Sequence, residues 1–369
     1  MYNRLRIPLS GLLLVATLAA VLFLTACGSA PTAKPAASNL KIDVFNAQKG
    51  LPNNEITSLA VFGGQVWAGT KNGLTRYDGV NWQIHVKKNT NALPSNDIEG
   101  LTVTPDSLLI ATENGAARYQ SGGFSSVITG LRSRSIAQNG PTIVMATAHG
   151  IEQSTGGQFQ AFGKENAQLV DDEVNVVAFD KKGRIWAGTR VGMGMFQGAM
   201  FQNFSGPAKT VMGSSLVEIP PSPANCQLIG NNIKCILPWK ERLAIGTTTG
   251  LTITDMENSY LSYTAPHKDW VQRGSQIVEE PVQGNSPLGD NVISALAASA
   301  DENTLFVGTR RGLGILHTNA WLDVSAKLPD LNGLSISALA IDKDTLWVGT
   351  PAGLLRVQGI GSLLPDSGK

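Results

Sequence analysis

A short motif recurs seven times along this chain and constrains its fold more than any other feature. Each copy has two or three apolar residues, then Gly or Ala, Thr, two variable residues and Gly, as in WAGTKNG at residues 67–73. Successive motif threonines are separated by 42, 35, 42, 58, 62 and 41 residues. A repeat near 40 residues with strand-type composition is typical of a β-propeller blade. These threonines are Thr70, Thr112, Thr147, Thr189, Thr247, Thr309 and Thr350.

Each repeat is predicted to form one four-stranded blade. In the first repeat we expect strands at 56–62, 65–70, 74–77 and 82–86. Gly73 suits the turn inside the motif, because glycine adopts positive φ without steric cost. An aromatic residue follows the threonine by 12 or 13 residues in most repeats, as Trp82 does, and we expect it to pack between neighbouring blades. The chain is therefore predicted to be an all-β, seven-bladed propeller over residues 40–360, followed by a tail at 361–369.

The seventh repeat lacks its last strand, and the missing strand is predicted at the other end of the chain. Residues 40–45 (LKIDVF) are followed by GLPNN, much as the strand at 82–86 is followed by ALPSN. We therefore expect the N-terminal strand to complete the last blade. Closing the ring in this way removes sheet edges that would otherwise invite aggregation.

The N-terminus is predicted to be a targeting segment. Arg4 and Arg6 precede an apolar run at 9–24, which is short for a membrane span and typical of a signal peptide. The run ends in Leu-Thr-Ala-Cys27, which resembles the bacterial lipobox. The resemblance implies a signal peptide at 1–26, a lipidated Cys27 and a tether over 27–39 that joins the propeller to a lipid bilayer. An ordinary secretory signal or an uncleaved anchor is the alternative.

The residue after Cys27 bears on the expected location. Gly28 stands where Gram-negative sorting rules place Asp for inner-membrane retention. By that resemblance, we expect an outer-membrane lipoprotein that faces the periplasm. Disulfides persist outside the cytoplasm, and eight residues separate Cys226 from Cys235. A disulfide between them is the preferred interpretation, and two free thiols are the alternative.

The composition excludes several classes of protein. The net charge is +1 and charged residues make up 15% of the chain, so the basic face that nucleic-acid binding requires is missing. The four histidines show no metal-ligand spacing, and no nucleophile motif is present. The acidic run at 171–173 lies in an expected turn, where Asp is locally favoured. We therefore expect no metal, no cofactor and no enzymatic activity.

The repeats resemble the two-component regulator propeller repeat. That pattern has a Leu-Pro-x-Asn turn, a strand, an Asp-x-x-Gly turn and then Leu-Trp-x-Gly-Thr-x-x-Gly-Leu. Residues 51–54 with 67–74 match it closely, as do 180–189 and 347–354. The resemblance implies the fold of periplasmic sensor propellers from hybrid histidine kinases. No kinase or receiver sequence follows Lys369, so we expect a stand-alone lipoprotein.

Two insertions mark the predicted binding face. They span 205–232 and 265–290, and both connect the last strand of one blade to the first strand of the next. Propeller topology puts these connections on the face that carries the T-x-x-G turns. Long loops are uncommon without a role, although plugging the channel mouth is an equally strong alternative. The candidate ligand or partner residues on this face are Trp270, His267, Arg273, Arg310, Arg311, Arg190 and His149.

An exposed Trp beside arginines suits recognition of a glycan or a partner protein. We therefore predict a non-catalytic, extracytoplasmic binding protein of sensor or scaffold type. The alternative is a propeller enzyme that acts on glycans, either a lyase or a hydrolase. A convergence of acids and histidines at the channel mouth, centred on His149 or Asp172, would favour that alternative.

Overall fold

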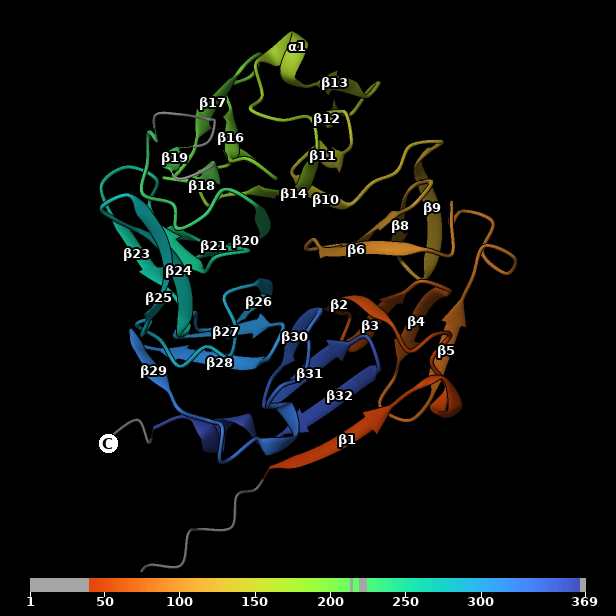
Figure 1. Cartoon of the computed structure of the whole chain (residues 1–369). Helices are drawn as coiled ribbons and strands as arrows, with labels where there is room; N and C mark the ends of the chain where they lie inside the picture. Colours follow the sequence, from red (N-terminus) through yellow and green to blue (C-terminus); the bar gives the residue numbers. More distant parts are fainter. Residues whose placement is uncertain (1–39, 213–214, 219–223, 366–369) are drawn as a thin grey trace, which may run out of the picture. The chain divides into compact units, whose positions relative to one another are not determined.

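Seven four-stranded antiparallel sheets are arranged in a ring in the computed structural model of the chain (Figure 1). The structure describes residues 40–212, 215–218 and 224–365. It confirms the predicted seven-bladed β-propeller, including closure by the N-terminal strand. The predicted signal peptide, Cys27 and the tether lie outside the described residues, as does the end of the predicted tail.

The first four blades follow one another along the chain, each numbered from its inner strand outwards. Blade one contains β2 (Ile56–Phe62), β3 (Gln65–Thr70), β4 (Gly73–Tyr77) and β5 (Trp82–His85). Blade two contains β6 (Ile98–Val103), β7 (Leu108–Thr112), β8 (Gly115–Gln120) and β9 (Gly123–Thr129). Blade three contains β10 (Ser135–Asn139), β11 (Thr142–Thr147), β12 (Gly150–Thr155) and β13 (Gln160–Phe162). Blade four contains β14 (Val174–Phe179), β15 (Ile185–Thr189), β16 (Met193–Phe196) and β17 (Phe201–Phe204).

The remaining elements complete the ring and add two hairpins. Blade five contains β20 (Ile233–Trp239), β21 (Arg242–Thr247), β22 (Leu251–Thr254) and β23 (Tyr260–Tyr263). Blade six contains β26 (Ile293–Ala298), β27 (Thr304–Thr309), β28 (Gly312–His317) and β29 (Ala320–Leu322). Blade seven contains β30 (Ala338–Asp342), β31 (Thr345–Thr350), β32 (Gly353–Gln358) and β1 (Lys41–Phe45). The hairpins are β18 (Lys209–Met212) with β19 (Ser215–Glu218), and β24 (His267–Arg273) with β25 (Gln276–Val282). Short helices are η1 (Ala47–Lys49), α1 (Lys164–Ala167), η2 (Pro329–Leu331) and η3 (Ile360–Leu363).

The motif threonine fixes the turn between the second and third strands of every blade. Thr70 is buried, and its hydroxyl donates a hydrogen bond to the carbonyl of Gly73 at 2.8 Å while accepting one from the backbone N–H of Asn72. All seven motif threonines make the hydroxyl-to-carbonyl bond. Gly73 has a φ of 143°, which a residue with a side chain rarely adopts. The repeat is therefore a set of identical, side-chain-capped turns.

The glycine before the motif threonine sets the distance between blades. A Cβ atom added at Gly308 would lie 2.6 Å from Cγ2 of Ile336, which begins the next blade. Corresponding pairs are Gly69 with Ile98, Gly188 with Ile233, Gly246 with Ile293 and Gly349 with Ile56.

In two repeats the motif glycine is replaced by a larger residue, and the facing residue of the next blade is smaller. They have Ala111 and Ala146 in place of glycine. The next blade then begins with the smaller Ser133 or Val174, and both are fully buried. Larger side chains at one position are therefore matched by smaller ones at its neighbour, as dense packing requires.

Side-chain hydrogen bonds also link each blade to the next around the ring. Thr57 donates to the carbonyl of Ile98 at 2.6 Å, and Asn175 donates to that of Ile233 at 2.9 Å. At the closing junction, Ser337 donates to the carbonyl of Ile56 at 2.5 Å. The other four junctions are bridged by Thr102 to Ile136, Arg134 to Val174, Cys235 to Ile293 and Ser294 to Ile336.

The N-terminal strand closes the seventh blade as expected. β1 pairs with β32 in antiparallel register from Lys41 opposite Gln358 to Phe45 opposite Leu354. Asp43 accepts two hydrogen bonds from the Arg356 guanidinium, the shorter at 2.6 Å. These bonds, together with the attraction of Arg356, hold the pKa of Asp43 below its usual value. Closure therefore combines backbone pairing with a cross-strand ion pair.

Aromatic residues of the outer strands pack between blades, which confirms the expectation from their spacing. Trp82 of blade one lies edge-on to Trp347 of blade seven, with ring centroids 6.4 Å apart. Phe201 and Trp321 pack in the same manner against buried residues of neighbouring blades. The start of the predicted tail also belongs to the core, because Leu363 of η3 is buried in the same cluster as Ile360, the last residue of the predicted propeller.

Within the described residues, no helix has the length and apolar character needed to cross a membrane.

The contact between Gly308 and Ile336 is testable by a double-mutant cycle. We expect Gly308→Ala to lower the free energy of unfolding by about 1–3 kcal/mol, because the new methyl group overpacks the junction. In an Ile336→Ala background, Gly308→Ala should lower the free energy of unfolding by at least about 1 kcal/mol less, because the Cγ2 atom of Ile336 is no longer there to clash with the new methyl group. Chemical denaturation measures both values.

Gly123→Ala is the control, because a Cβ atom there makes only one ordinary contact, at 3.9 Å. Equal costs for Gly308→Ala in both backgrounds would contradict the assigned contact.

Candidate binding face

The two insertions lie next to the T-x-x-G turns on one face of the propeller. We call this the insertion face: it carries the connections between blades and the turns after the seven motif threonines. The hydroxyl of Thr249, in the turn of blade five, donates to the carbonyl of Ile229 at the end of the first insertion. A Cβ atom added at Gly289, at the end of the second insertion, would meet the Arg311 carbonyl of blade six. Both insertions are thus anchored on these turns.

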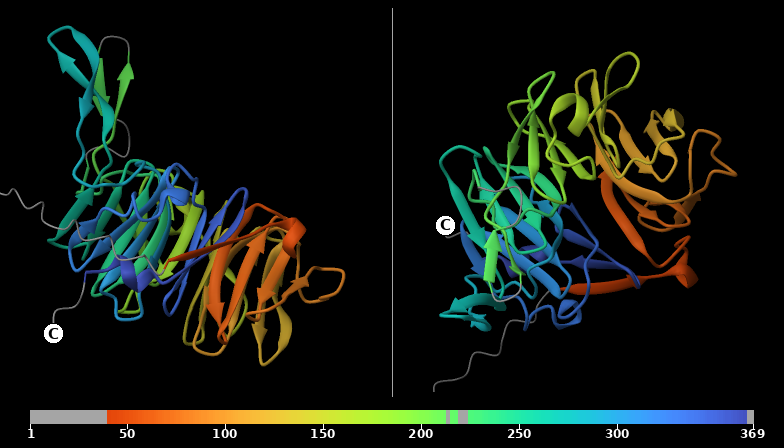
Figure 2. Two further views of the ribbon diagram at one scale, coloured as in Figure 1. Left: turned by 90° about the horizontal axis from the view of Figure 1, so that it is seen from below. Right: turned by 45° about the horizontal axis from the view of Figure 1, so that its top comes forward.

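The insertions fold as β-hairpins that stand away from the blades. Figure 2 shows β18–β19 and β24–β25 side by side, extending beyond the face from which they arise. The backbone N–H of Leu216 donates to Oε1 of Gln272 at 3.3 Å, which joins the first hairpin to the second. The hairpins therefore extend outwards and do not plug the channel mouth.

Trp270 is an exposed aromatic side chain on this pair of hairpins. It lies on β24 opposite Glu279, and 48% of its surface is exposed. Met212 and Val217 of the first hairpin are also exposed, as is Val282 of the second. Single exposed apolar residues are ordinary, but several on one projection are typical of an interaction site.

His267 and Arg273 lie at the two ends of β24 and make local contacts. Nδ1 of His267 lies 2.9 Å from the carbonyl oxygen of Ala265. The Arg273 guanidinium binds both carboxylate oxygens of Glu280 at 2.8 Å, and this pairing lowers the pKa of Glu280. The Arg273 guanidinium therefore stabilises its own hairpin, and fewer of its N–H groups remain to bind a ligand.

The other predicted residues are distributed around the insertion face. His149, Arg190, Arg310 and Arg311 are exposed in the turns of blades three, four and six. Among the described residues, no hydrogen bond or cation–aromatic contact joins Trp270 to Arg310 or Arg311. The predicted cluster of Trp with arginines is therefore not formed, because the hairpin carries Trp270 away from the turns.

A network of paired charges on blades one to three was not predicted from the sequence. The Lys71 amine lies 3.0 Å from Asp97 and 3.4 Å from Glu99, and Arg132 bridges Glu99 and Glu113 at 2.9 and 2.8 Å. Burial opposes the charge of Lys71, but the two carboxylates outweigh it and raise its pKa. The carboxylates approach closely enough to hold a cation, but here they are already bridged by basic side chains.

The acidic run at 171–173 has local partners. Glu173 accepts a hydrogen bond from Arg134 at 2.7 Å, which lowers the pKa of its carboxyl. Asp172 accepts one from the backbone N–H of Lys164 at 2.6 Å, at the start of α1. Asp171 lies 3.9 Å from Arg190. These acids order the connection between blades three and four.

Two histidines, the buried His85 and the half-buried His317, have structural surroundings. His85 stacks on Trp67 with ring centroids 5.7 Å apart, and burial lowers its pKa to about 4. The ring of His317 shares a hydrogen bond of 2.9 Å with the Thr304 hydroxyl. Both side chains therefore contribute to packing and hydrogen bonding within their blades.

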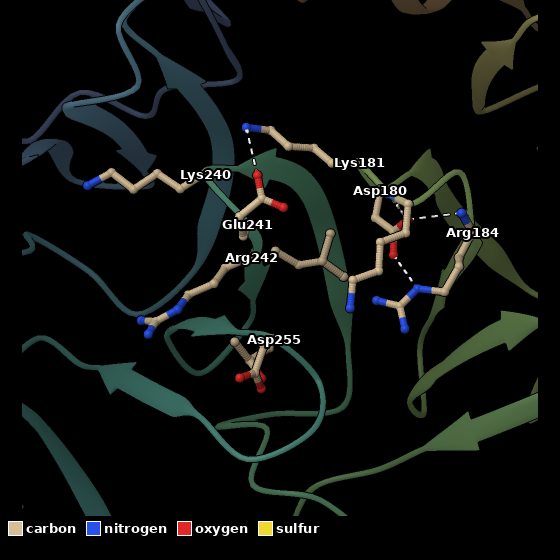
Figure 3. Close-up of a pocket in the computed structure, with 10 residues that line it drawn as sticks. Asp180, Lys181, Arg184, Lys240, Glu241, Arg242 and Asp255 are labelled. Carbon is tan, nitrogen blue, oxygen red and sulfur yellow. Dashed lines mark hydrogen bonds and ion pairs between the residues drawn. The ribbon is translucent and has the colours of Figure 1, made fainter.

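The opposite face carries the Asp-x-x-Gly turn of blade four (Figure 3). Asp180 accepts hydrogen bonds from Arg184 at 2.6 Å and from the indole of Trp186 at 2.9 Å. Burial opposes the charge of Asp180, but these bonds dominate and lower its pKa. The acid of this motif is therefore a turn-forming residue.

The expected disulfide is wrong. Cys226 and Cys235 are free thiols. Cys235 lies on β20, with its thiol directed at the Ile293 carbonyl of blade six, whereas Cys226 packs into the core between blades four and five. The two thiols therefore belong to different blade interfaces. Burial raises the pKa of Cys235 to about 12 and also raises that of Cys226.

Comparison with known proteins identifies the fold but no sequence family. No family model and no curated protein sequence matches the chain. Among solved structures, the chain is similar to the extracellular domain of the BT4673 one-component or hybrid two-component system of B. thetaiotaomicron. The two structures of that domain match with 18% identity and TM-scores of 0.59 and 0.60, and each match covers 85% of this chain and 39% of that one. The chain thus spans about two fifths of the length of that domain.

Two further matches have different functions. Virginiamycin B lyase of Staphylococcus aureus, in an inactive variant with quinupristin, has 13% identity and a TM-score of 0.58, covering 86% of this chain and 99% of the lyase. PorZ of Porphyromonas gingivalis, a surface component of the type-IX secretion system, has 15% identity and a TM-score of 0.52. That match covers 85% of this chain and 47% of PorZ. At these identities the similarity defines the chain as a β-propeller protein of the same fold.

The state of the two cysteines is directly testable. We expect iodoacetamide to modify both Cys226 and Cys235 in denaturant without reductant, because no bond joins them. In the native protein Cys235 should resist modification, since the surroundings of its thiol raise its pKa to about 12 and leave little of the reactive thiolate. Peptide mapping by mass spectrometry measures the extent of modification of each cysteine in the denatured and the native protein. A Cys226–Cys235 linked peptide would contradict the structure.

Proposed function

We propose that this protein is a non-catalytic, extracytoplasmic binding lipoprotein of sensor or scaffold type. The pair of hairpins on the insertion face contacts a protein partner or a glycan-like ligand. Cys27 anchors the chain in the outer membrane, with the propeller in the periplasm. The observation that carries the proposal is the joint projection of β18–β19 and β24–β25 with Trp270 exposed on it.

The arrangement of the hairpins supports a contact role. They arise from adjacent blade junctions, are joined by the bond between Leu216 and Gln272, and lie beyond the blade core. Their exposed aromatic and aliphatic side chains add nothing to the packing of the propeller. Aromatic anchors of this kind account for much of the binding energy in many interfaces. The similarity to an extracellular domain of a two-component system agrees with an envelope location.

The charges on the insertion face favour binding over catalysis. Glu99, Glu113 and Glu173 are paired with Arg132 or Arg134, and Asp172 binds the backbone of α1. A general acid or base needs access to its substrate, and these pairings leave the carboxylates occupied by other groups of the chain. His149 is exposed in its turn, apart from this network.

A photo-crosslinking experiment tests the proposed contact surface. Benzoylphenylalanine replaces Trp270 in one variant and Val80 in another, and each is irradiated with envelope extract. Val80 is a matched control because it is an 80% exposed apolar residue on the opposite face. We expect a discrete crosslinked product from position 270 only. The same products from both positions would contradict the proposal.

The captured partner then allows a quantitative measurement. Truncating an aromatic anchor typically costs about 2 kcal/mol, or roughly thirtyfold in affinity. We therefore expect Trp270→Ala to weaken binding by about that factor in a titration, while Val80→Ala leaves it unchanged. Unchanged binding in Trp270→Ala would exclude Trp270 as the anchor.

The anchor itself is tested separately. Cys27→Ser removes the thiol that lipidation requires, so the variant should leave the membrane fraction and appear in the periplasmic extract. Cys226→Ser is the control, because a thiol inside the propeller has no part in anchoring. Retention of the Cys27→Ser protein in salt-washed membranes would show that the lipoprotein assignment is wrong.

A further inference from the structure

A cleft of about 510 Å³ lies between blades five and six, at a site apart from the hairpins. One side is the turn from Trp239 to Arg242, which joins β20 and β21. The other side includes Leu316 on β28 and Asn319 in the turn that follows it. Both turns belong to the face opposite the insertion face. The volume is within the range of small-molecule sites, about 300–1,000 Å³.

The inner wall of the cleft is apolar. Leu261 and Tyr263 are two residues apart on β23, so both side chains are directed to the same side of the strand, towards blade six. Ile253 and Leu316 complete this wall. Leu261 is 41% exposed, which is high for a leucine on a blade strand. The wall therefore offers an uncovered apolar surface to a ligand.

Two basic side chains line the same cleft. The Lys240 amine lies 4.7 Å from the centroid of the Trp239 ring, and Arg242 is two residues further along the turn. Figure 3 shows both side chains extending to the same side, away from the ion pair of Asp180 and Arg184. Neither Lys240 nor Arg242 has a carboxylate within 4.0 Å among the residues that the structure describes. Neither side chain is therefore held in an ion pair; backbone hydrogen bonds from Ser259 and Glu257, with a smaller contribution from the charge of Arg242, lower the pKa of the nearby Asp255 carboxyl.

The acidic groups near this turn are Glu241, Glu302 and Asp255, and the Asp255 carboxylate accepts hydrogen bonds from the backbone N–H groups of Glu257, Asn258 and Ser259. Glu241 lines the cleft, but its carboxylate is 3.9 Å from the amine of Lys181. Glu302 of blade six binds the Lys181 amine at 2.7 Å and accepts a hydrogen bond from the backbone N–H of Lys240 at 3.0 Å. This bond fixes Lys240 at a φ of 55° and joins the turn to blade six. The basic residues are thus held on an ordered turn.

Trp239 adds an aromatic ring to the same cleft. Its side chain lines the cleft, 2% of its residue surface is exposed, and the Lys240 amine lies over its ring. The ring therefore extends the apolar wall next to the basic group.

We propose that this cleft binds an amphipathic anion: a carboxylate or sulfonate attached to an aromatic or aliphatic body. Lys240 and Arg242 bind the anionic group, and the wall of Ile253, Leu261, Tyr263 and Leu316 covers the apolar body. The site shares no residue with the hairpin pair. It is therefore independent of the function proposed for the insertion face.

Titration with the fluorescent probe anilinonaphthalene sulfonate tests this site on the purified chain. The probe carries a sulfonate on an aromatic body, so its fluorescence should rise to saturation with one site per chain. We expect the double variant Lys240→Gln, Arg242→Gln to weaken binding at least tenfold. The double variant Lys87→Gln, Lys88→Gln removes the same charge from two exposed residues of blade one and should bind like the unaltered chain.

Two further variants locate the probe. Leu261→Glu places a negative charge on the apolar wall and should abolish saturable binding, with thermal unfolding measured to confirm the fold. Trp270→Ala should bind normally, because the hairpins are not involved. Wild-type affinity in the Lys240, Arg242 variant would overturn the proposal. Loss of binding in Trp270→Ala would overturn it as well, because the probe would then occupy the hairpins.

Discussion

The contact between the motif glycine of one blade and the first residue of the next is the constraint on which the rest of the propeller depends. At five junctions the glycine admits an isoleucine side chain at a distance that no Cβ atom would tolerate. At the other two, alanine is matched by the smaller Ser133 or Val174. The spacing of the ring is thus set by pairs of residues that are complementary in volume. Inter-blade hydrogen bonds, such as that from Thr57 to Ile98, then fix the register between blades.

Because these contacts between blades fix the spacing of the ring, the residues of the turns are free to vary. The buried threonine caps each turn and the glycine after the variable pair permits its backbone conformation, so those two positions accept Lys, Glu, His or Arg without cost to the fold. The same freedom allows an entire hairpin to be inserted between blades. Function in such a protein therefore concentrates on connections that the blade core does not constrain.

The two candidate sites use this freedom differently. The hairpin pair extends apolar side chains such as Trp270 into solvent, where a large partner can reach them. The cleft between blades five and six is concave and combines an apolar wall with Lys240 and Arg242, which suits a small ligand. The charged network around Glu99 and Arg132 belongs to neither site, because its charges satisfy one another.

The sequence alone determined the fold, since seven copies of a turn motif with regular spacing have few solutions, and the missing strand after Gly353 had a counterpart at residues 40–45. It also determined which face carries the insertions, because strand order fixes the side on which each connection lies. Only the tertiary structure decided what the insertions do in space. Sequence spacing gave no direction to the hairpins, so Trp270 was expected beside Arg310 and is instead carried away from it.

The two cysteines also show that sequence spacing does not determine the direction of a side chain. Eight intervening residues permit a disulfide, but β-strand alternation places Cys235 on the side of β20 that faces blade six. The cleft was likewise hidden, because its residues lie on β20 to β23 and β28 and come together only when two blades pack. Local periodicity determines strands and turns, whereas the direction of a side chain across a blade interface depends on contacts between residues that are distant in the sequence.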